Sequence, residues 1–262
     1  MAQKTFKRYE LKFRIDEEKF DIIKEHISEY MNPDEYCKND GSYMIYNVYF
    51  DTDNDEIIRK SIAKPYYKEK LRLRSYKIPE SDKDRVFLEL KKKIGGIVSK
   101  RRATMSYGSA IELIRSGQKP TTLSYTDNMV LDEIAEFLKR YPAKPKVFLS
   151  YERIAFHGKD DHEFRVTFDK NILTRRENPS FYSGDYGSEL LSDGSYLMEV
   201  KINGAFPLWF AEMLSELEVY TSGFSKYGEE YKKYARSKQS KEITNQVSIA
   251  LSNVLLHGLK KS

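Results

Sequence analysis

The sequence contains a single cysteine, Cys37, so no disulfide can form within the chain. Because structural disulfides belong to oxidising compartments, this scarcity suits a reducing one, and we expect a cytoplasmic protein. No run of about 18 apolar residues occurs, and the first residues lack the apolar centre of a signal peptide. We therefore expect neither secretion nor a membrane-spanning helix.

Two further absences narrow the chemistry. The sequence has only four histidines, which are scattered without the spacing of metal ligands. No glycine-rich turn leads from a strand into a helix, which argues against a Rossmann sheet and favours antiparallel hairpins with helices outside. The net charge is only +5, since 45 basic residues face 40 acidic ones. That balance gives no reason to expect nucleic-acid binding.

The sequence instead has a high charged fraction, 32%, and much of it alternates with apolar residues. In KLRLR, residues 70–74, Leu71 and Leu73 alternate with three cations. A β-strand with this period places the leucines on one face and the cations on the other, about 7 Å apart along the strand. The same alternation recurs at 8–14, 85–95, 97–107, 146–157, 163–173 and 195–204.

These patterns predict one α+β domain with about eight strands, connected mostly as meanders. We expect strands at 6–15, 42–52, 67–77, 85–95, 97–107, 146–157, 163–173 and 195–204. We expect helices at 16–30, 54–62, 108–116, 127–140, 207–217 and 225–236. An amphipathic helix is predicted at 241–257, with Gly258 as its stop. The predicted division is a domain of residues 1–236 and a C-terminal helical tail of residues 237–262.

Two architectures explain the alternation. An ordinary antiparallel sheet has one core face and one solvated face. However, the polar faces here carry Lys, Arg and a few Glu almost exclusively, and they do so in every strand. We therefore expect a closed antiparallel eight-stranded barrel with its charged faces inward and helices packed outside. About ten inward cations would repel one another unless a polyanion such as a triphosphate or polyphosphate filled the tunnel.

Eight segments in this order resemble a known family: YELKF, KLRLRSY, FLELKKK, SKRRATM, SYERIAF, FRVTFD, YLMEVKI and SGFSKYG. They are similar to the catalytic VTC domain, the vacuolar transporter chaperone polyphosphate polymerase, in the triphosphate tunnel metalloenzyme (CYTH-like) superfamily. The similarity extends from about residue 6 to 228. The superfamily's ExExK signature is incomplete, because position 8 is Arg and only Glu10 and Lys12 remain. This departure argues mildly against a plain triphosphatase.

The resemblance and the strand parity together suggest functional residues. The residues expected to act on the transferred phosphate are Arg72, Arg74, Lys91, Arg153, Arg165 and Lys226. Those expected to bind substrate are Lys12, Lys70, Lys93, Lys100, Arg102, Tyr151, Lys201 and Ser225. The resemblance implies a catalytic Mn²⁺ or Mg²⁺ on Glu199, with Glu10 and Glu89 as further candidates, and places Ser225 and Lys226 at a tunnel mouth.

The implied function is a metal-dependent polyphosphate polymerase, which transfers the γ-phosphate of ATP to a growing inorganic polyphosphate chain and releases ADP. One alternative is a triphosphatase or polyphosphatase that hydrolyses its substrate in the same tunnel, and another is a non-catalytic polyanion-binding module. The expected partners are ATP and polyphosphate and not nucleic acid. The tail either packs on the outside of the barrel or contacts a protein partner or a membrane.

The inward cations are expected to bind substrate and not to stabilise the fold. On that view, replacing Arg72 or Arg153 by Ala leaves the melting temperature unchanged or higher while turnover collapses.

Overall fold

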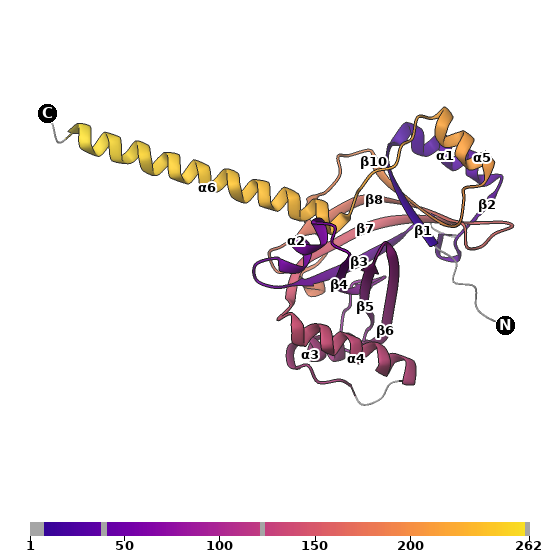
Figure 1. Cartoon of the computed structure of the whole chain (residues 1–262), viewed down its shortest axis with the longest axis horizontal. Coiled ribbons are helices and arrows are strands. Elements are labelled where there is room, and N and C mark those ends of the chain that lie inside the picture. Colours follow the sequence, from indigo (N-terminus) through magenta and orange to yellow (C-terminus); the bar gives the residue numbers. More distant parts are fainter. Residues whose placement is uncertain (1–7, 38–40, 121–123, 260–262) are drawn as a thin grey trace. The chain divides into compact units, whose positions relative to one another are not determined.

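The computed structural model describes residues 8–37, 41–120 and 124–259, and it divides into two compact units, Met1–Phe224 and Ser225–Ser262 (Figure 1). The first unit contains the sheet and the helices α1 to α5. The second contains the long helix α6, Lys226–Leu259. Each unit is described here by itself.

The first unit is built on an antiparallel sheet of ten strands in the described part of the chain. Eight of them form a continuous path in the order β1-β10-β8-β7-β3-β4-β5-β6. Their bounds, in that order, are Arg8–Asp16, Ser195–Asn203, Arg165–Arg175, Lys144–Gly158, Tyr43–Asp51, Tyr67–Ser75, Arg85–Ile94 and Ile97–Ser106. Two short strands lie off this path: β2, Met31–Pro33, pairs with β7, and β9, Ser188–Glu189, pairs with β8. The predicted α+β class and antiparallel pairing are confirmed.

The helices of the first unit form where the sequence predicted them. They are α1 (Glu17–Ser28), α2 (Glu56–Ile62), α3 (Tyr107–Ser116), α4 (Tyr125–Arg140) and α5 (Leu208–Glu216). Two 3₁₀ turns, η1 (Glu35–Cys37) and η2 (Phe181–Ser183), and the strands β2 and β9 have no counterpart in the prediction. Each of these is only two or three residues long, too short for a hydrophobic period to appear.

Local chemistry fixes the helix starts. The carboxylate of Asp16 accepts a hydrogen bond from the backbone N–H of Lys19 and caps α1. Ser106 and Ser124 do the same for α3 and α4. In α1 the buried residues follow a helical period, Phe20, Ile23 and Ile27.

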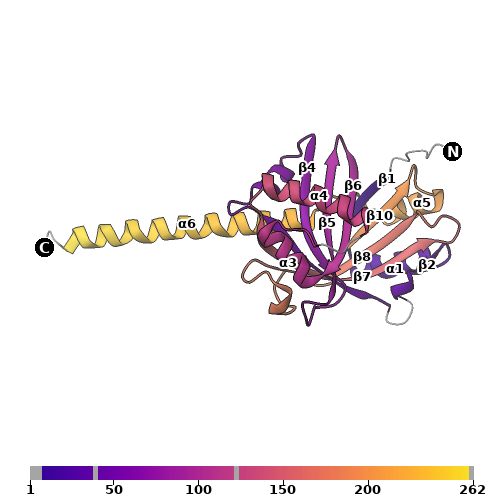
Figure 2. The ribbon, with the colours of Figure 1, turned by 90° about the horizontal axis from the view of Figure 1, so that it is seen from below.

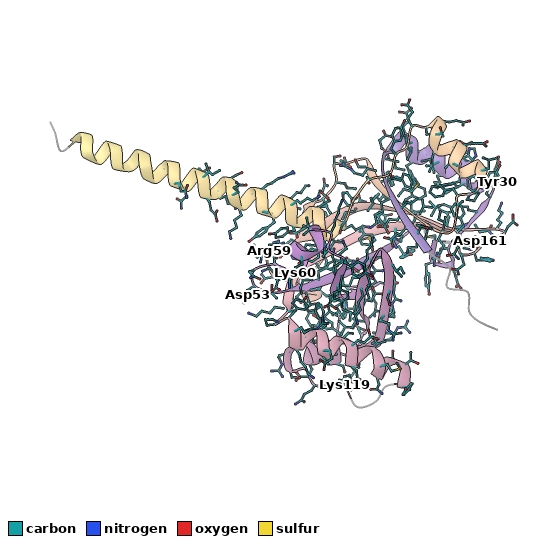
Figure 3. All side chains as sticks on the ribbon, in the orientation of Figure 1. Tyr30, Asp53, Arg59, Lys60, Lys119 and Asp161 are labelled. Atoms are coloured by element: carbon teal, nitrogen blue, oxygen red, sulfur yellow. The ribbon has the colours of Figure 1, made fainter. Side chains whose placement is uncertain are left out.

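Apolar residues of the sheet pack outward in two separate clusters. Figures 1 and 2 show the two helical layers that cover them, α3 with α4 and α1 with α5. One joins β3 to β6 with α3 and α4, and it includes Leu71 and Leu73 of the KLRLR stretch. The other joins β1, β7, β8 and β10 with α1 and α5. In Figure 3, Lys119 marks the layer of α3 and α4 and Tyr30 the layer of α1 and α5. Because both helical layers cover the apolar faces, the charged faces point to the inside of the curled sheet.

The expected closed barrel does not form. The strands β1 and β6 are the two ends of the path, and no described residues of these strands pair with each other. Part of the free edge of β1 is taken by another segment. Phe13 forms an isolated bridge with Thr221, and the Ser222 N–H donates to the Lys12 carbonyl at 2.6 Å. An edge that already has this partner cannot form the same bonds with β6.

The sheet nevertheless curls until its two ends face each other. The ammonium of Lys91 on β5 lies 3.6 Å from the carboxylate of Glu10 on β1, although these strands are far apart in the path. The charged residues therefore lie on the concave side of a curled sheet that is continuous from β1 to β6.

In the second unit, α6 is one continuous helix of 34 residues. It spans residue 236, where the sequence suggested a domain boundary, because no proline and no glycine lie between Gly228 and Gly258. Gly258 does not stop the helix, which ends at Leu259. Among the described residues, no helix combines the length and apolar composition that a membrane span requires.

Candidate active site

The charged residues singled out by strand parity share the inner face. Nine cations lie around its centre in the described residues: Lys12, Lys70, Arg72, Arg74, Lys91, Lys100, Arg102, Arg153 and Lys201. Four carboxylates accompany them, Glu10, Glu89, Asp169 and Glu199. Positive groups therefore outnumber negative ones at the centre, and Lys68 and Lys93 continue the same face farther along β4 and β5.

Glu89 on β5 is the anion at the centre of the first group, and its side chain is only 1% exposed. Its Oε2 accepts from Arg72 Nε at 2.8 Å, and its Oε1 from Arg102 Nε at 2.6 Å. Lys100 Nζ lies 2.8 Å from Oε1, and Arg74 Nε 3.9 Å from Oε2. Burial opposes ionisation of Glu89, but the cations, Arg72 first, outweigh it and hold the pKa of this carboxyl well below its ordinary value. One carboxylate thus fixes the positions of four cations.

A second group surrounds Lys12 on β1. Its ammonium lies 3.1 Å from Glu199 Oε1 and 3.3 Å from Glu10 Oε1. Burial alone would lower the pKa of Lys12, but Glu199 and Glu10 raise it above its ordinary value. Burial likewise opposes ionisation of Glu10, and Lys91 and Lys12 lower its pKa to about 2. Glu10 therefore faces these cations in its ionised form.

A third group joins Arg153 on β7 to Asp169 on β8. Two hydrogen bonds run from Arg153 to the carboxylate, at 2.6 and 2.7 Å, and a third contact reaches Glu199 Oε2 at 3.4 Å. The Arg153 guanidinium also lies 5.2 Å from the ring of Tyr151, whose hydroxyl accepts from Arg74 Nη2 at 3.0 Å. Tyr151 therefore connects this group to the one around Glu89.

Three lysines of the inner face have lowered pKa values. Burial, and then the neighbours Lys68, Lys91, Lys12 and Arg72, lower the pKa of Lys70 to about 7. Burial, which outweighs the attraction of nearby carboxylates, lowers the pKa of Lys100 to about 7 and of Lys201 to about 8. Burial and neighbouring positive charges destabilise the charged form of these lysines. An anion bound among them would offset this destabilisation.

Some predicted residues lie elsewhere. Arg165 pairs with Asp34 at 2.8 Å, and its side chain is 46% exposed, so the structure does not bring it to the other arginines. Lys93 lies farther along β5, where with Lys64, Lys68 and the turn residues 65–66 and 95–96 it lines a cavity of about 380 Å³.

Ser225 and Lys226 belong to the second unit. The Ser225 hydroxyl accepts from the backbone N–H of Gly228 at 3.3 Å at the start of α6. Their role at a tunnel mouth stays a prediction.

The carboxylates of the inner face differ in how well their surroundings allow them to bind a metal ion. Glu10 and Glu199 approach the same ammonium, so a divalent cation with phosphate oxygens could be held between them. Glu89 does not fit, since four cations already surround it. No group of three or more Asp, Glu, His or Cys suited to a metal occurs among the described residues, so substrate oxygens would have to complete the coordination.

Sequence reasoning missed several residues of the inner face. Asp169 follows Arg165 and Thr167 at every second residue of β8. This alternation alone was sufficient to predict that Asp169 faces inward. Tyr49 accepts from Arg72 Nη1 at 3.1 Å, and Asn47 accepts from Arg74 Nε at 2.9 Å. Neither had a signal in the sequence, because tyrosine and buried asparagine in a strand are also common in ordinary sheets.

The model of the VTC domain family matches residues 7–235. The chain belongs to the VTC domain family. The resemblance drawn from the eight motifs is thereby confirmed, and membership supports an enzyme of the triphosphate tunnel type. A comparison with curated proteins gives no match.

Solved structures with similar folds are distant in sequence from this VTC domain. A "putative adenylate cyclase" from Bacillus halodurans is 16% identical, with a TM-score of 0.48, over 84% of this chain and 95% of that one. One from Vibrio parahaemolyticus is 12% identical, with a TM-score of 0.42, over 85% and 96%. A protein from Pyrococcus horikoshii is 13% identical, with a TM-score of 0.40, over 86% and 99%. Each score is too low to carry a conclusion about this chain.

Proposed function

We propose that this VTC domain is a metal-dependent polyphosphate polymerase that transfers the γ-phosphate of ATP to the end of an inorganic polyphosphate chain and releases ADP. One observation carries the proposal. The centre of the inner face has nine cations against four carboxylates in the described residues, and the cations continue past the central group toward Lys68 and Lys93.

The length of this cationic track distinguishes a polymer substrate from a small one. Arg74, Arg72, Lys70 and Lys68 follow one another on β4 at every second residue. At the rise of a strand, six residues span about 20 Å. A single triphosphate group is shorter than that, so the track has room for a donor and for an acceptor chain beyond it.

The residues of the central group suit phosphoryl transfer. An oxygen of the acceptor's terminal phosphate attacks the γ-phosphorus, the bond from γ-phosphorus to the bridging oxygen breaks, and ADP leaves with the electron pair. Arg72, Arg74 and Arg102 would stabilise the charge on the equatorial oxygens, because their guanidinium groups form forked hydrogen bonds with phosphate. Glu89 keeps these groups in place without taking part in the transfer.

Glu10 and Glu199 would hold the Mn²⁺ or Mg²⁺ ion together with phosphate oxygens. When bound, such an ion neutralises phosphate charge and helps to align the donor and acceptor. The chain's own Lys12, already bonded to both carboxylates, would bind phosphate oxygens beside it. Ser225 and Lys226 remain proposed contributors at a tunnel mouth, and Arg165 remains a proposed phosphate-binding residue. A protein partner for α6 is also still a proposal.

The product formed from ATP tests the proposal. With ATP and Mn²⁺, the purified protein should release ADP and accumulate a phosphate ladder that a polyphosphatase digests, and pyrophosphate should shorten any lag as a primer. Glu199→Gln should lower synthesis by at least about a hundredfold, as expected when a group that stabilises charge in the transition state is lost. Glu133→Gln is the matched control, because Glu133 also pairs with two cations, Lys92 and Arg101, but on the outer side.

Two results would change the assignment. Orthophosphate released in step with ADP, without a ladder at any primer concentration, would make the protein a hydrolase. The absence of ADP with every common divalent metal would make it a polyanion-binding module.

A further inference from the structure

Four aromatic side chains continue the inner face beyond the central cations. The ring centroids of Tyr36 and Tyr43 lie 5.9 Å apart, those of Tyr43 and Tyr76 6.1 Å, and those of Tyr76 and Phe87 5.5 Å. Each ring thus contacts the next, although the four come from η1, β3, the end of β4 and β5. We call Tyr36, Tyr43, Tyr76 and Phe87 the aromatic row.

The aromatic row lies beside the central cations. Phe87 precedes Glu89 by two residues on β5, and Tyr76, directly after β4, follows Arg74 by two residues. A step of two residues along a strand is about 7 Å and keeps the same face. Tyr43 is in register with Arg153 of β7, so this ring is level with one of the inner cations. Cations therefore lie close to the aromatic row on both β5 and β7.

Arg102 joins the two regions through one guanidinium group. It lies 4.6 Å from the ring centroid of Phe87 and donates to the Tyr76 hydroxyl at 3.5 Å. The same group donates to Glu89 at 2.6 Å. A phosphate bound by Arg102 would thus have aromatic rings directly beside it.

Core packing does not account for these rings. None of the four belongs to either apolar cluster of the described residues. Tyr36 is 73% exposed and Tyr76 42%, so their faces are available to a ligand. The rings are tilted against one another by 56° to 73°, so their faces are not used up by mutual stacking. Exposed aromatic rings beside a phosphate-binding group are an arrangement that proteins use to bind nucleobases.

The opposite end of the track has a different chemistry. There Lys64, Lys68 and Lys93 line the cavity of about 380 Å³. Burial first, and then Lys93, Lys64 and Lys91, lower the pKa of Lys68. This end suits phosphate groups, whereas the aromatic end suits a group with a flat apolar face. The two ends of the inner face therefore distinguish the two ends of a nucleoside triphosphate.

We propose that the aromatic row binds the nucleoside of a nucleoside triphosphate, with its phosphates directed inward past Arg102 toward Lys68 and Lys93. The inference rests on the proposed function and adds the orientation of the donor and the direction in which the polymer leaves. Because every base has a π-face, stacking discriminates little between bases. ATP and GTP should therefore bind alike.

Binding of ATP and of inorganic tripolyphosphate to the full chain tests this proposal. Calorimetry in one Mg²⁺ buffer would compare the wild type with Tyr43→Leu and Tyr76→Leu. Each substitution should weaken ATP binding at least about fivefold, since stacking contributes about 1–3 kcal/mol per base. Affinity for tripolyphosphate, which has no base, should change less than about twofold in the same variants.

Two variants serve as controls. Tyr125→Leu removes an aromatic ring that is 81% exposed on the outer helix α4, and should change neither affinity. Tyr76→Phe removes the hydroxyl near Arg102 but keeps the ring, so it should retain ATP binding. This variant separates stacking from any effect of the hydroxyl on Arg102.

Several outcomes would overturn the inference. Equal weakening of ATP and tripolyphosphate would mean that the rings only position Arg102, and unchanged ATP binding in both leucine variants would mean that no base stacks on them. An equal loss of ATP binding in Tyr125→Leu would show that the effect is not specific to the aromatic row. Failure of wild type to bind either ligand would instead reject the proposed function. A protein that binds both and builds no ladder would reject the polymerase while leaving the aromatic row intact.

Discussion

At the scale of single residues, Glu89 decides how the inner cations are arranged. A buried carboxylate is costly unless charged partners surround it, and four cations do so here. In return, the carboxylate holds together groups that would otherwise repel one another and disperse. The cations still outnumber the carboxylates, so the arrangement is preorganised for an added anion.

The adjacent pair Arg101 and Arg102 on β6 gives a sharp test of this arrangement. Arg102 faces inward to Glu89, whereas Arg101 faces outward and donates to Glu133 of α4 at 2.9 Å. Arg102→Ala should lower ATP-dependent ADP release by about a hundredfold or more, as when one transition-state donor is removed. Arg101→Ala should leave the rate within about twofold, since an exposed ion pair contributes little. Equal losses in steady-state assays of the two variants would contradict the assignment of faces.

The expectation that Arg153→Ala leaves the fold unchanged must be revised. Arg153 is buried and forms two hydrogen bonds with the buried Asp169. Its removal leaves that carboxylate without its main partner, so the free energy of unfolding should fall by about 3–5 kcal/mol. Denaturation in urea would measure the loss. The double variant Arg153→Met/Asp169→Leu should recover most of the stability, and no recovery would show that the pair does not determine it.

At the scale of elements, β4 and β5 form a hairpin. It contributes apolar residues to the core and cations to the track along the inner face. Alternate residues of β4 pack against α3 and α4 or face inward, and a shift of register by one residue would exchange the two sets. The β5–β6 turn is fixed by Gly95, whose φ is +53°, and a Cβ there would meet the Tyr66 ring at 2.9 Å. The turn therefore maintains the lysine-lined cavity next to it.

The lysines at this end of the hairpin should contribute more to the binding of long polyphosphate chains than to the binding of tripolyphosphate. Lys68→Ala/Lys93→Ala removes two cations that lie beyond the central group. We expect at least about a tenfold loss of affinity for polyphosphate, in line with two lost phosphate contacts, and less than about a twofold change for tripolyphosphate. Competition binding with chains of defined length would measure both, with the outward-facing Lys92→Ala as control. An equal loss for both ligands would place the triphosphate at this end.

At the scale of the whole molecule, positive charge is concentrated on the inner face. The chain has 45 basic and 40 acidic residues, whereas the centre of the inner face has nine cations and four carboxylates in the described residues. The field that attracts a polyanion is therefore expected to be strongest there. This concentration of positive charge destabilises the folded protein when no anion is bound. The unfolded chain holds more protons on Lys70 than the fold does between pH 7 and the ordinary lysine pKa, so stability should rise with pH across this range.

Polyanion binding should take up protons. In the free protein Lys70 and Lys100 have pKa values of about 7 and are mostly neutral at pH 8. Bound phosphate favours their charged forms, so about one to two protons should enter with the ligand at pH 8. Affinity should accordingly fall as pH rises above 7. Calorimetry of tripolyphosphate binding in two buffers of different ionisation enthalpy would measure the uptake, and Lys70→Met should reduce it. Binding without proton exchange at pH 8 would contradict these pKa values.

The sequence by itself determined which residues face inward and which face the core. It could do so because the strand period is two, and because burying an apolar side chain stabilises the fold by about 1.5–3 kcal/mol. Leu71 and Leu73 therefore had to lie opposite their neighbouring cations. The same local information fixed the helix starts, as at Asp16, and the family, since the motifs are continuous in sequence.

Only the tertiary structure decided which charges meet. Arg165 has the correct parity, yet it pairs with Asp34 because that loop passes close to its strand. Glu89 has the parity of a metal ligand, yet it lies among four cations from neighbouring strands. The edge of β1 was expected to meet another strand, and it instead meets residues 221–222. These outcomes depend on distances between residues far apart in the chain, and a local period carries no information about them.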